Sequence, residues 1–455
     1  MDLGDKSRST RTVYYLLAVA CLESSIRLSP DLRSSITDRI RKIHPLVTKS
    51  EARVLSTAGD LSIPLLKRFS GQRAQCAAAC VRALRLIGSD DALEVLEQYG
   101  ADKRSTVIQE IVGAWQAFDR ERFAQRVLSQ TPGVNGALVL EGPSSLKGVR
   151  YLRKISSLSL ELWRRTIKQD ELDEIGTLTN LKTLVILSNR EIESFDFLRR
   201  LTSLVYLRIS LPGEIHSIPT LPSLEVLYLN RDVKQGALEA ISKSDKLKTL
   251  ELMLADDVTD VTALENLKAI TSLSLLGRGS PDISFVTHLS KLEGLQIVGR
   301  SIPTDLNLIA QSAHLKRLVL HPSGPNGIRD LSFLRGLPRL EALSIGCSEL
   351  PEHIEALRDL THLGAIEIAG PTAFRDLSFL AEATKLRHIS LPTVTRVDDV
   401  AAFAKFQKLR RLILSDALRS AVPELQLPEN VSVRFMPRNP NTMYYGSSVW
   451  YWPMM

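Results

Sequence analysis

The stretch LTNLKTLVIL, residues 178–187, decides the fold, because its spacing of leucines returns along most of the chain. It has the form L-x-x-L-x-x-L-x-L. Close copies are LTSLVYLRIS (201–210), LPSLEVLYLN (221–230), LSKLEGLQIV (289–298), LPRLEALSIG (337–346) and LTHLGAIEIA (360–369). The third apolar position of each copy serves as a marker, and the markers recur about every 23 residues. These markers are Leu158, Leu184, Leu207, Leu227, Leu250, Leu273, Leu295, Leu318, Leu343, Ile366, Ile389, Leu412 and Val433.

Each unit contains a segment that alternates as a β-strand does. In its L-x-L part the leucines point to one side and the residues between them point to the other. One such strand is too short to be stable alone, so about thirteen stacked units would form a parallel sheet over a continuous leucine core. The pattern resembles the short bacterial leucine-rich repeats. We therefore predict an α/β solenoid, a leucine-rich-repeat horseshoe with a parallel β-sheet, over residues 131–436.

A second regularity lies ahead of the strands. An aspartate stands at a fixed distance before several markers, and a phenylalanine often follows three residues after that position, as in RDLSFLRGLPRLEALSI. An aspartate at the start of a short apolar turn can accept backbone N–H bonds as an N-cap, and the phenylalanine would face the core. We therefore interpret these carboxylates as structural rather than catalytic. The residues are Asp260, Asp282, Asp330, Asp376 and Asp399, and Phe197, Phe285, Phe333 and Phe379.

Residues 1–130 show helical spacing instead. SPDLRSSITDRIRKI begins at Ser29, and SDDALEVLEQYG begins at Ser89 and ends at Gly100, with a serine as the expected N-cap in both. About six or seven such helices with short connections are typical of an α-solenoid, and one pair resembles a HEAT-type hairpin. The other helical segments lie at 50–69, 72–88, 105–118 and 120–129. We therefore predict a HEAT-like all-α domain at 1–130, the repeats at 131–436, and a tail at 437–455.

The stretch TVYYLLAVACLESS, residues 12–25, allows two interpretations. A basic leader and an apolar run that ends in AVAC are typical of an export signal, with a lipoprotein-like cleavage site before Cys21. The helical spacing nevertheless continues to Leu28 and leads directly into further amphipathic helices. This continuity favours a cytosolic helix. We therefore expect a cytoplasmic protein and keep an exported lipoprotein or adhesin as the alternative.

Composition excludes several classes of function. With 44% apolar and 24% charged residues the chain can bury a core, and a net charge of +7 is modest for its length. It lacks both the concentrated basic patch of nucleic-acid-binding proteins and an apolar run long enough to span a membrane. The cysteines Cys21, Cys76, Cys80 and Cys347 are too few for a disulfide framework, and nothing near Cys76 and Cys80 completes a metal site. We predict buried free thiols, no metal, no cofactor, and neither nucleic acid nor membrane as a partner.

The N-terminal sequence also carries a family resemblance. YLLAVACLE, an S-P-D-L-R helix, an EARVLSTAGDLSIPLL helix and a leucine-rich-repeat array together resemble the C-terminal half of bacterial NACHT proteins, which are STAND-type signalling NTPases. In that family a helical region and a ligand-sensing repeat domain follow a nucleotide-switched NTPase. This chain has no G-x-x-x-x-G-K-[ST] motif to hold phosphates. The resemblance therefore implies a sensor half without its NTPase, with a separate NTPase chain as one candidate partner.

Binding residues are expected where side chains alternate with the strand leucines, because these line the concave face of a solenoid. Aromatic and arginine side chains dominate most protein interfaces. Three groups stand out: Tyr206, Arg208 and Tyr228 on neighbouring strands, Arg317 with His321, and Arg411 with Arg434. The candidate binding residues are Tyr206, Arg208, Tyr228, Asn230, Arg317, His321, Arg411 and Arg434, and the same solvated ladder includes Glu251, Gln296, Glu367 and His388.

The C-terminal stretch NTMYYGSSVWYWPMM, residues 441–455, concentrates aromatic side chains. Trp450, Tyr451 and Trp452 would either cap the leucine core of the last repeat or form a hydrophobic motif that docks on a partner. No H-E-x-x-H or G-x-S-x-G motif occurs in the chain, so no catalytic residue is predicted. We expect a non-enzymatic sensor module that binds a protein partner or a proteinaceous ligand on its repeat surface.

Overall fold

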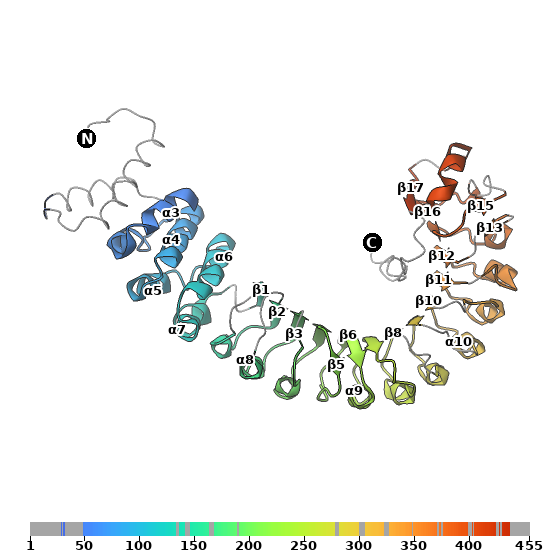
Figure 1. Cartoon of the computed structure of the whole chain (residues 1–455), viewed down its shortest axis with the longest axis horizontal. Coiled ribbons are helices and arrows are strands. Elements are labelled where there is room, and N and C mark those ends of the chain that lie inside the picture. The colour runs from blue at the N-terminus through green and yellow to red at the C-terminus, as the bar shows by residue number, and fades with distance from the viewer. Residues whose placement is uncertain are drawn as a thin grey trace. The chain divides into compact units, whose positions relative to one another are not determined.

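The computed structural model describes residues 49–436 together with Ser29 and Asp31 (Figure 1). The chain divides into two compact units, Met1–Leu204 and Val205–Met455, and each unit is described by itself. Within 49–436 the undescribed positions are 133–135, 142–145, 163–167, 189–190, 278–281, 300–304, 323–326, 348, 371–372, 375, 399–402, 404, 425–426 and 428–429.

Unit 1 begins with helices packed around an aromatic core. The helix α4 packs against α3 and α6, and the side chains of Tyr99, Trp115 and Phe123 are fully buried. Ser89 is the N-cap of α5 and its side chain accepts a hydrogen bond from the backbone N of Ala92 at 3.2 Å, as predicted. The elements are α3 (Lys49–Ser56), η1 (Gly59–Leu65), α4 (Ala74–Ile87), α5 (Asp90–Glu97), α6 (Ser105–Ala114), η2 (Trp115–Ala117), α7 (Arg120–Arg126) and η3 (Leu128–Gln130).

One helical segment differs from the prediction. Residues 50–69 hold the end of α3, which stops at Ser56, and then the separate 3-10 helix η1, which begins at Gly59. The backbone of Gly59 has a positive φ of 54°, which a glycine adopts easily and which one continuous α-helix over this stretch would not allow. Pro64 inside η1 then removes a backbone donor that a longer α-helix would need.

The first repeats also belong to unit 1. The strands β1 (Ala137–Glu141), β2 (Ser157–Leu162) and β3 (Thr183–Ser188) are parallel, and the markers Leu158 and Leu184 are register partners. The links between strands contain η4 (Val149–Tyr151), α8 (Gln169–Ile175) and η5 (Asp196–Arg200). The helix α7 packs on η4, where Glu121 accepts a hydrogen bond from the hydroxyl of Tyr151 at 3.0 Å and forms an ion pair with Arg150. The helices therefore cover the start of the repeat array.

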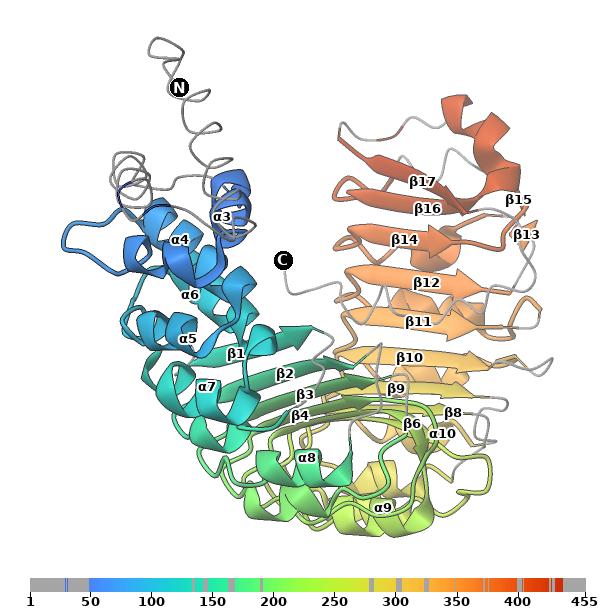
Figure 2. The same ribbon diagram turned by 60° about the vertical axis from the view of Figure 1, so that its left-hand side comes forward.

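Unit 2 is a parallel sheet in which each marker lies beside the marker of the next repeat (Figure 2). The markers Leu207, Leu250, Leu318 and Leu412 are at most 1% exposed. The predicted leucine-rich-repeat solenoid preceded by helices is confirmed. The strands, in order across the sheet, are β4 (Tyr206–Ser210), β6 (Val226–Val233), β7 (Thr249–Leu254), β8 (Ser272–Gly277), β9 (Gly294–Gly299), β10 (Arg317–Pro322), β11 (Ala342–Gly346), β12 (Ala365–Ala369), β14 (His388–Leu391), β16 (Arg411–Ser415) and β17 (Ser432–Met436).

In the described part of unit 2, short helices and small strands connect the strands of the sheet. The helices are α9 (Gln235–Ile241), η6 (Thr262–Asn266), η7 (Ser284–His288), α10 (Asn307–Ala310), η8 (Ser332–Gly336), η9 (Ile354–Asp359), η10 (Ser378–Leu380) and η12 (Asp416–Glu424). The small strands are β5 (Glu214–Ile215), β13 (Ala373–Phe374) and β15 (Arg396–Val397). Figure 1 shows the helices on the side of the sheet that carries the leucine core.

The repeated aspartates have the structural role that was predicted. Each accepts a hydrogen bond from the backbone N–H of the residue that begins the next 3-10 helix, at 2.9 Å for Asp260 and 2.8 Å for Asp282. Asp330 and Asp376 do the same at 2.8 and 2.7 Å, whereas Asp399 lies outside the described residues. The aspartate lies one residue before the N-cap position itself, so it satisfies the first free N–H of each turn. The phenylalanines that follow are buried: Phe197, Phe285, Phe333 and Phe379.

Candidate functional site

The candidate site lies on the sheet face opposite the leucine core, here called the concave face. Side chains alternate along each strand, so Leu207 and Ile209 enter the core while Tyr206 and Arg208 face the other way. The parallel register then aligns Arg208 on β4 with Tyr228 on β6. The same row continues with Glu251 on β7.

Tyr206, Arg208, Tyr228 and Glu251 form a cluster that is called the open patch here. The ring centroids of Tyr206 and Tyr228 lie 5.8 Å apart with the rings tilted by 47°. Arg208 is exposed, and the two tyrosines and Glu251 are half-buried. Burial raises the pKa of the Glu251 carboxyl, and the positive charge of Arg208 opposes that rise. The structure thus brings together the first group that was predicted from sequence.

Asn230 lies beside the open patch, where β6 departs from regular pairing. The register between β6 and β7 shifts between Leu229 and Asp232, and the end of β6 pairs with the small strand β5. Lys234 follows the bulge, and its Nζ lies 2.9 Å from Glu214 and 3.1 Å from Asp257. The Oδ1 atom of Asn230 is buried and has no hydrogen-bond partner in the described part of the chain.

In the other two predicted groups, the residues differ in exposure or do not align on neighbouring strands. Arg317 and His321 lie on β10 and face the same side, but Arg317 is half-buried and His321 is buried. Arg411 and Arg434 are both exposed, yet Arg411 aligns with His388 whereas Arg434 aligns with Ile413. Burial, together with the charges of Arg411 and other arginines, lowers the pKa of His388.

The expectation of a solvated ladder is wrong for its middle part. Gln296 and His321 are each 6% exposed and Glu367 is 5% exposed, although all three face away from the leucine core. The strands β9, β11 and β12 are buried along their whole length, on both faces. His321 is therefore not an accessible binding residue in this structure.

His321, Ser344 and Glu367 form a buried polar row across three neighbouring strands. The Nε2 of His321 lies 2.6 Å from the Oγ of Ser344, which donates to Oε1 of Glu367 at 3.2 Å. Since the serine proton is directed at Glu367, the neutral imidazole carries its proton on Nε2 and donates to Ser344. Burial lowers the pKa of His321 to about 4.

This burial predicts a pH-dependent stability. The unfolded chain, in which His321 has its ordinary pKa of 6.5, binds a proton more readily than the folded chain does. The contribution of His321 to the free energy of unfolding should therefore be constant above about pH 7 and fall as the pH drops from 6.5 toward 4, by about 1–3 kcal/mol. The Glu367 carboxylate, 3.7 Å away, offsets part of the loss.

Urea denaturation of the full chain at a series of pH values measures this effect. His321→Gln should make the fall between pH 6.5 and 4 shallower, with His388 still contributing, whereas His362→Gln, at an exposed position, should leave it unchanged. Parallel curves for the wild-type chain and His321→Gln between pH 6.5 and 4 would contradict the assignment.

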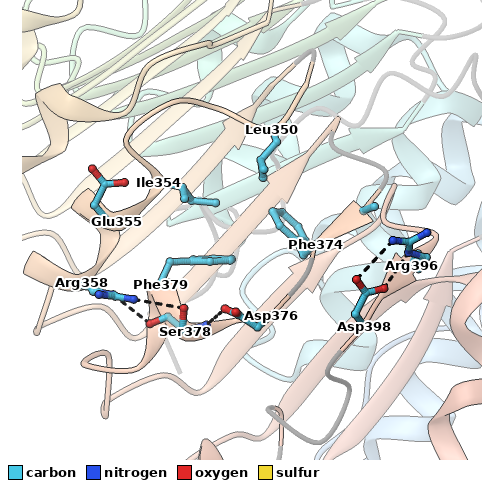
Figure 3. Close-up of a pocket in the computed structure, with 11 residues that line it drawn as sticks. Leu350, Ile354, Glu355, Arg358, Phe374, Asp376, Ser378, Phe379, Arg396 and Asp398 are labelled. Carbon is cyan, nitrogen blue, oxygen red and sulfur yellow. Dashed lines mark hydrogen bonds and ion pairs between the residues drawn. The ribbon is translucent and has the colours of Figure 1, made fainter.

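A side pocket of about 370 Å³ lies away from the concave face, next to the small strands β13 and β15 (Figure 3). Its apolar part includes Phe374 and Phe379, whose ring centroids lie 5.4 Å apart, and Leu350, which is 57% exposed. Its rim carries the ion pair of Arg396 with Asp398, at 2.8 Å. No pattern in the sequence predicted this pocket, although β13 and β15 pair in register at equivalent positions of consecutive repeats.

Other sequence predictions concern cysteines, metals and the chain ends. Cys76, Cys80 and Cys347 are buried and free, as predicted, and burial raises the pKa of Cys80 to about 11. Within the described ranges, no group of three or more potential ligand side chains could hold a metal ion. No helix in those ranges has the length and apolar character needed to cross a membrane. Cys21 and the tail residues Trp450, Tyr451 and Trp452 lie outside the described residues.

Comparison with known proteins gives distant similarities. No protein-family model matches the chain. A probable disease resistance protein of Arabidopsis thaliana is 26% identical over 248 residues, which cover 49% of this chain and 29% of that protein. The chain thus spans less than a third of that relative. An internalin of Listeria monocytogenes is 19% identical with a TM-score of 0.49, covering 67% of this chain and 92% of the internalin. A leucine-rich-repeat protein of Leptospira interrogans is 17% identical with a TM-score of 0.45, covering 74% and 97%.

Proposed function

We propose that this protein is a non-enzymatic recognition module that binds a protein partner on its concave face, at the open patch. The observation that carries the proposal is the juxtaposition of Tyr206, Arg208 and Tyr228 on adjacent strands, facing away from the core. Tyrosine and arginine are enriched among the few residues that carry most of the binding free energy of protein interfaces, because they combine large apolar area with directed polar groups.

Electrostatics around the open patch also favours a protein ligand. Glu251 is already partly removed from water, and Arg208 lies close enough to influence its pKa. A partner that covers both would strengthen their attraction by lowering the local dielectric.

The signalling context is part of the same proposal. The resemblance to NACHT proteins favours a cytoplasmic sensor whose helices relay binding to an NTPase carried on a separate chain. The buried free thiols Cys76, Cys80 and Cys347 suit a reducing compartment. The intact mass of the N-terminal peptide tests this placement, because a lipid-modified Cys21 at the mature N-terminus would support the exported lipoprotein instead.

The binding proposal is tested by affinity purification of the full chain from its native source. We expect a co-purifying protein, and we expect its binding to Arg208→Glu to be weaker by at least about tenfold, since loss of a hot-spot arginine at the centre of an interface costs about 2 kcal/mol or more. An NTPase among the co-purifying proteins would support the signalling context.

Arg339→Glu is the matched control. It makes the same charge reversal in unit 2, at an exposed position that precedes β11 and does not lie on the concave face. The assignment to the open patch would be overturned if both variants lost partner binding equally, or if Arg208→Glu bound the partner as the wild-type chain does.

A further inference from the structure

The concave face changes from open to covered along unit 2. On β7 half-buried and buried residues alternate, as they do on β2 and β3 in unit 1. On β9, β11 and β12 every residue is buried. Since the leucine core protects only one face of the sheet, a second layer must protect the other face of these strands. Figure 2 shows β9, β10, β11 and β12 side by side in the sheet.

The covered zone contains side chains that neighbouring strands alone would leave in contact with water. Val319 and Ser344 are 0% exposed, and the longer Gln296 and Glu367 are only 6% and 5% exposed. Glu251, at the equivalent position of β7, is half-buried. The centre of the zone is an apolar cluster of Val298, Val319, Ala342 and Ala365, with Leu276 packed at its margin.

We propose that the chain's own C-terminal segment, residues 437–455, docks on this apolar cluster of the concave face. In the described part of the chain, the strands from β9 to β12 and β14 have their main contacts with neighbouring strands of the sheet, and the helices between them contact chiefly one another. The chain leaves β17 at Met436, and in a parallel sheet this lies at the edge where the other strands also end. The segment therefore starts beside the zone that needs a cover.

The length of the segment is sufficient. An extended chain advances roughly 3.3 Å per residue, so the stretch from Met436 to Trp450 can span about 45 Å. Adjacent strands lie about 4.8 Å apart, which puts β10 roughly 24 Å from β17 across the sheet. Trp450, Tyr451 and Trp452 can thus reach the cluster around Val319 without strain.

The amino-acid composition of residues 437–455 suits contact with the apolar cluster and with its buried acceptor. It contains five aromatic residues and no aspartate or glutamate, so exposing it to water is costly. Tyrosine and tryptophan also bring O–H and N–H donors, which suit a surface whose buried polar groups include the acceptor Glu367. The absence of acidic side chains avoids repulsion from that carboxylate.

The end of the array is a poorer alternative site for these aromatics. Val433 and Phe435, on the core side of β17, stay half-buried, and Arg419 lies over the Phe435 ring at 4.3 Å. On the neighbouring β16, Ile413 and Ser415 on the concave face are buried. The side chains of the concave face are therefore better shielded from water than the core side chains at the end of the last repeat.

Docking of the segment goes beyond the proposed function and does not depend on it. The segment would occupy the central part of the concave face and leave the open patch as the accessible part. A partner that needs Arg317 or His321 would first have to displace the segment.

Photo-crosslinking of the full chain tests the docking. A benzophenone amino acid at position 451, in place of Tyr451, is irradiated, and the crosslinked peptides are identified by mass spectrometry. We expect intrachain crosslinks to the peptides that contain β9, β10, β11 and β12. Val319→Arg should reduce their yield by about tenfold, because the docked segment would bury an unpaired charge. Val139→Arg, at the equivalent position of β1 and already 54% exposed, should leave the yield unchanged.

Three results would overturn the docking. Crosslinks confined to β17 and η12 would show a cap on the last repeat. Crosslinks between chains, with a yield that rises with protein concentration, would show a second copy on the concave face. The absence of any crosslink to β9–β12 in the wild-type background would also overturn it, whether or not Val319→Arg folds. None of these results bears on partner binding at Arg208, so the two proposals can fail separately.

Discussion

Gly370→Ala is expected to lower the free energy of unfolding of the chain by about 3–5 kcal/mol. Gly370 follows β12 with a φ of +112°, which side chains other than glycine rarely adopt. A Cβ atom there would lie 1.5 Å from the backbone oxygen of Cys347 in the preceding repeat. The backbone after β12 would have to move away from Cys347. This movement would break the hydrogen bond from the Gly370 N–H to Thr393 Oγ1, which is 2.7 Å long.

Gly364→Ala is the matched control, at the other end of the same strand. A Cβ atom at position 364 would meet only ordinary contacts, with Glu341 O at 3.7 Å and Lys385 O at 3.9 Å. Its effect should stay within about 1 kcal/mol. Urea denaturation followed by far-ultraviolet circular dichroism compares the two. If both variants unfold at the same urea concentration, the close approach of Gly370 to Cys347 is incorrect.

The second large effect is expected for Leu184→Ala in unit 1. Leu184 is 0% exposed on β3, where its side chain packs in the core beside Leu158 of β2. Its truncation should cost about 2–5 kcal/mol through lost apolar contact and the cavity that remains. The same denaturation measurement, applied to the full chain, gives the value.

Val185→Ala is the control for Leu184→Ala, because the next residue faces the opposite side of the strand. Val185 is half-buried on the concave face, so the expected cost is below about 1 kcal/mol. A shift of the strand by one residue would exchange the two faces and reverse the order of the effects. A larger loss for Val185→Ala would thus contradict the register of the repeat.

Much of the fold could be predicted from the sequence because the same leucine pattern recurs in every repeat. Every unit places a leucine at the same position, and an alternating strand can bury only one face by itself. The markers Leu207, Leu318 and Leu412 lie in the core for that reason. The aspartates were also predictable, since a backbone N–H at the start of a turn needs an acceptor.

The accessibility of the concave face could not be predicted in the same way. Alternation tells which side His321 and Glu367 face, but not whether a second layer covers that side. One signal was present. Val298, Val319 and Ile413 put apolar side chains on the outward face, as strands buried on both faces do.

The side pocket was missed for a different reason. The strands β13 and β15 are only two residues long, too short to carry a periodic pattern. Phe379 was predicted to enter the core, whereas its contact with Phe374 depends on where two loops meet. Such contacts follow from tertiary packing and not from local spacing.

The most direct test of partner recognition at the open patch is hydroxyl-radical footprinting of the full chain, with and without its co-purified protein partner. Both tyrosines of the patch are partly exposed and therefore reactive in the unbound chain. We predict that binding protects Tyr206 and Tyr228 and leaves the labelling of Leu350 in the side pocket unchanged. Protection of Leu350 with unchanged labelling of Tyr206 and Tyr228 would contradict recognition on the concave face.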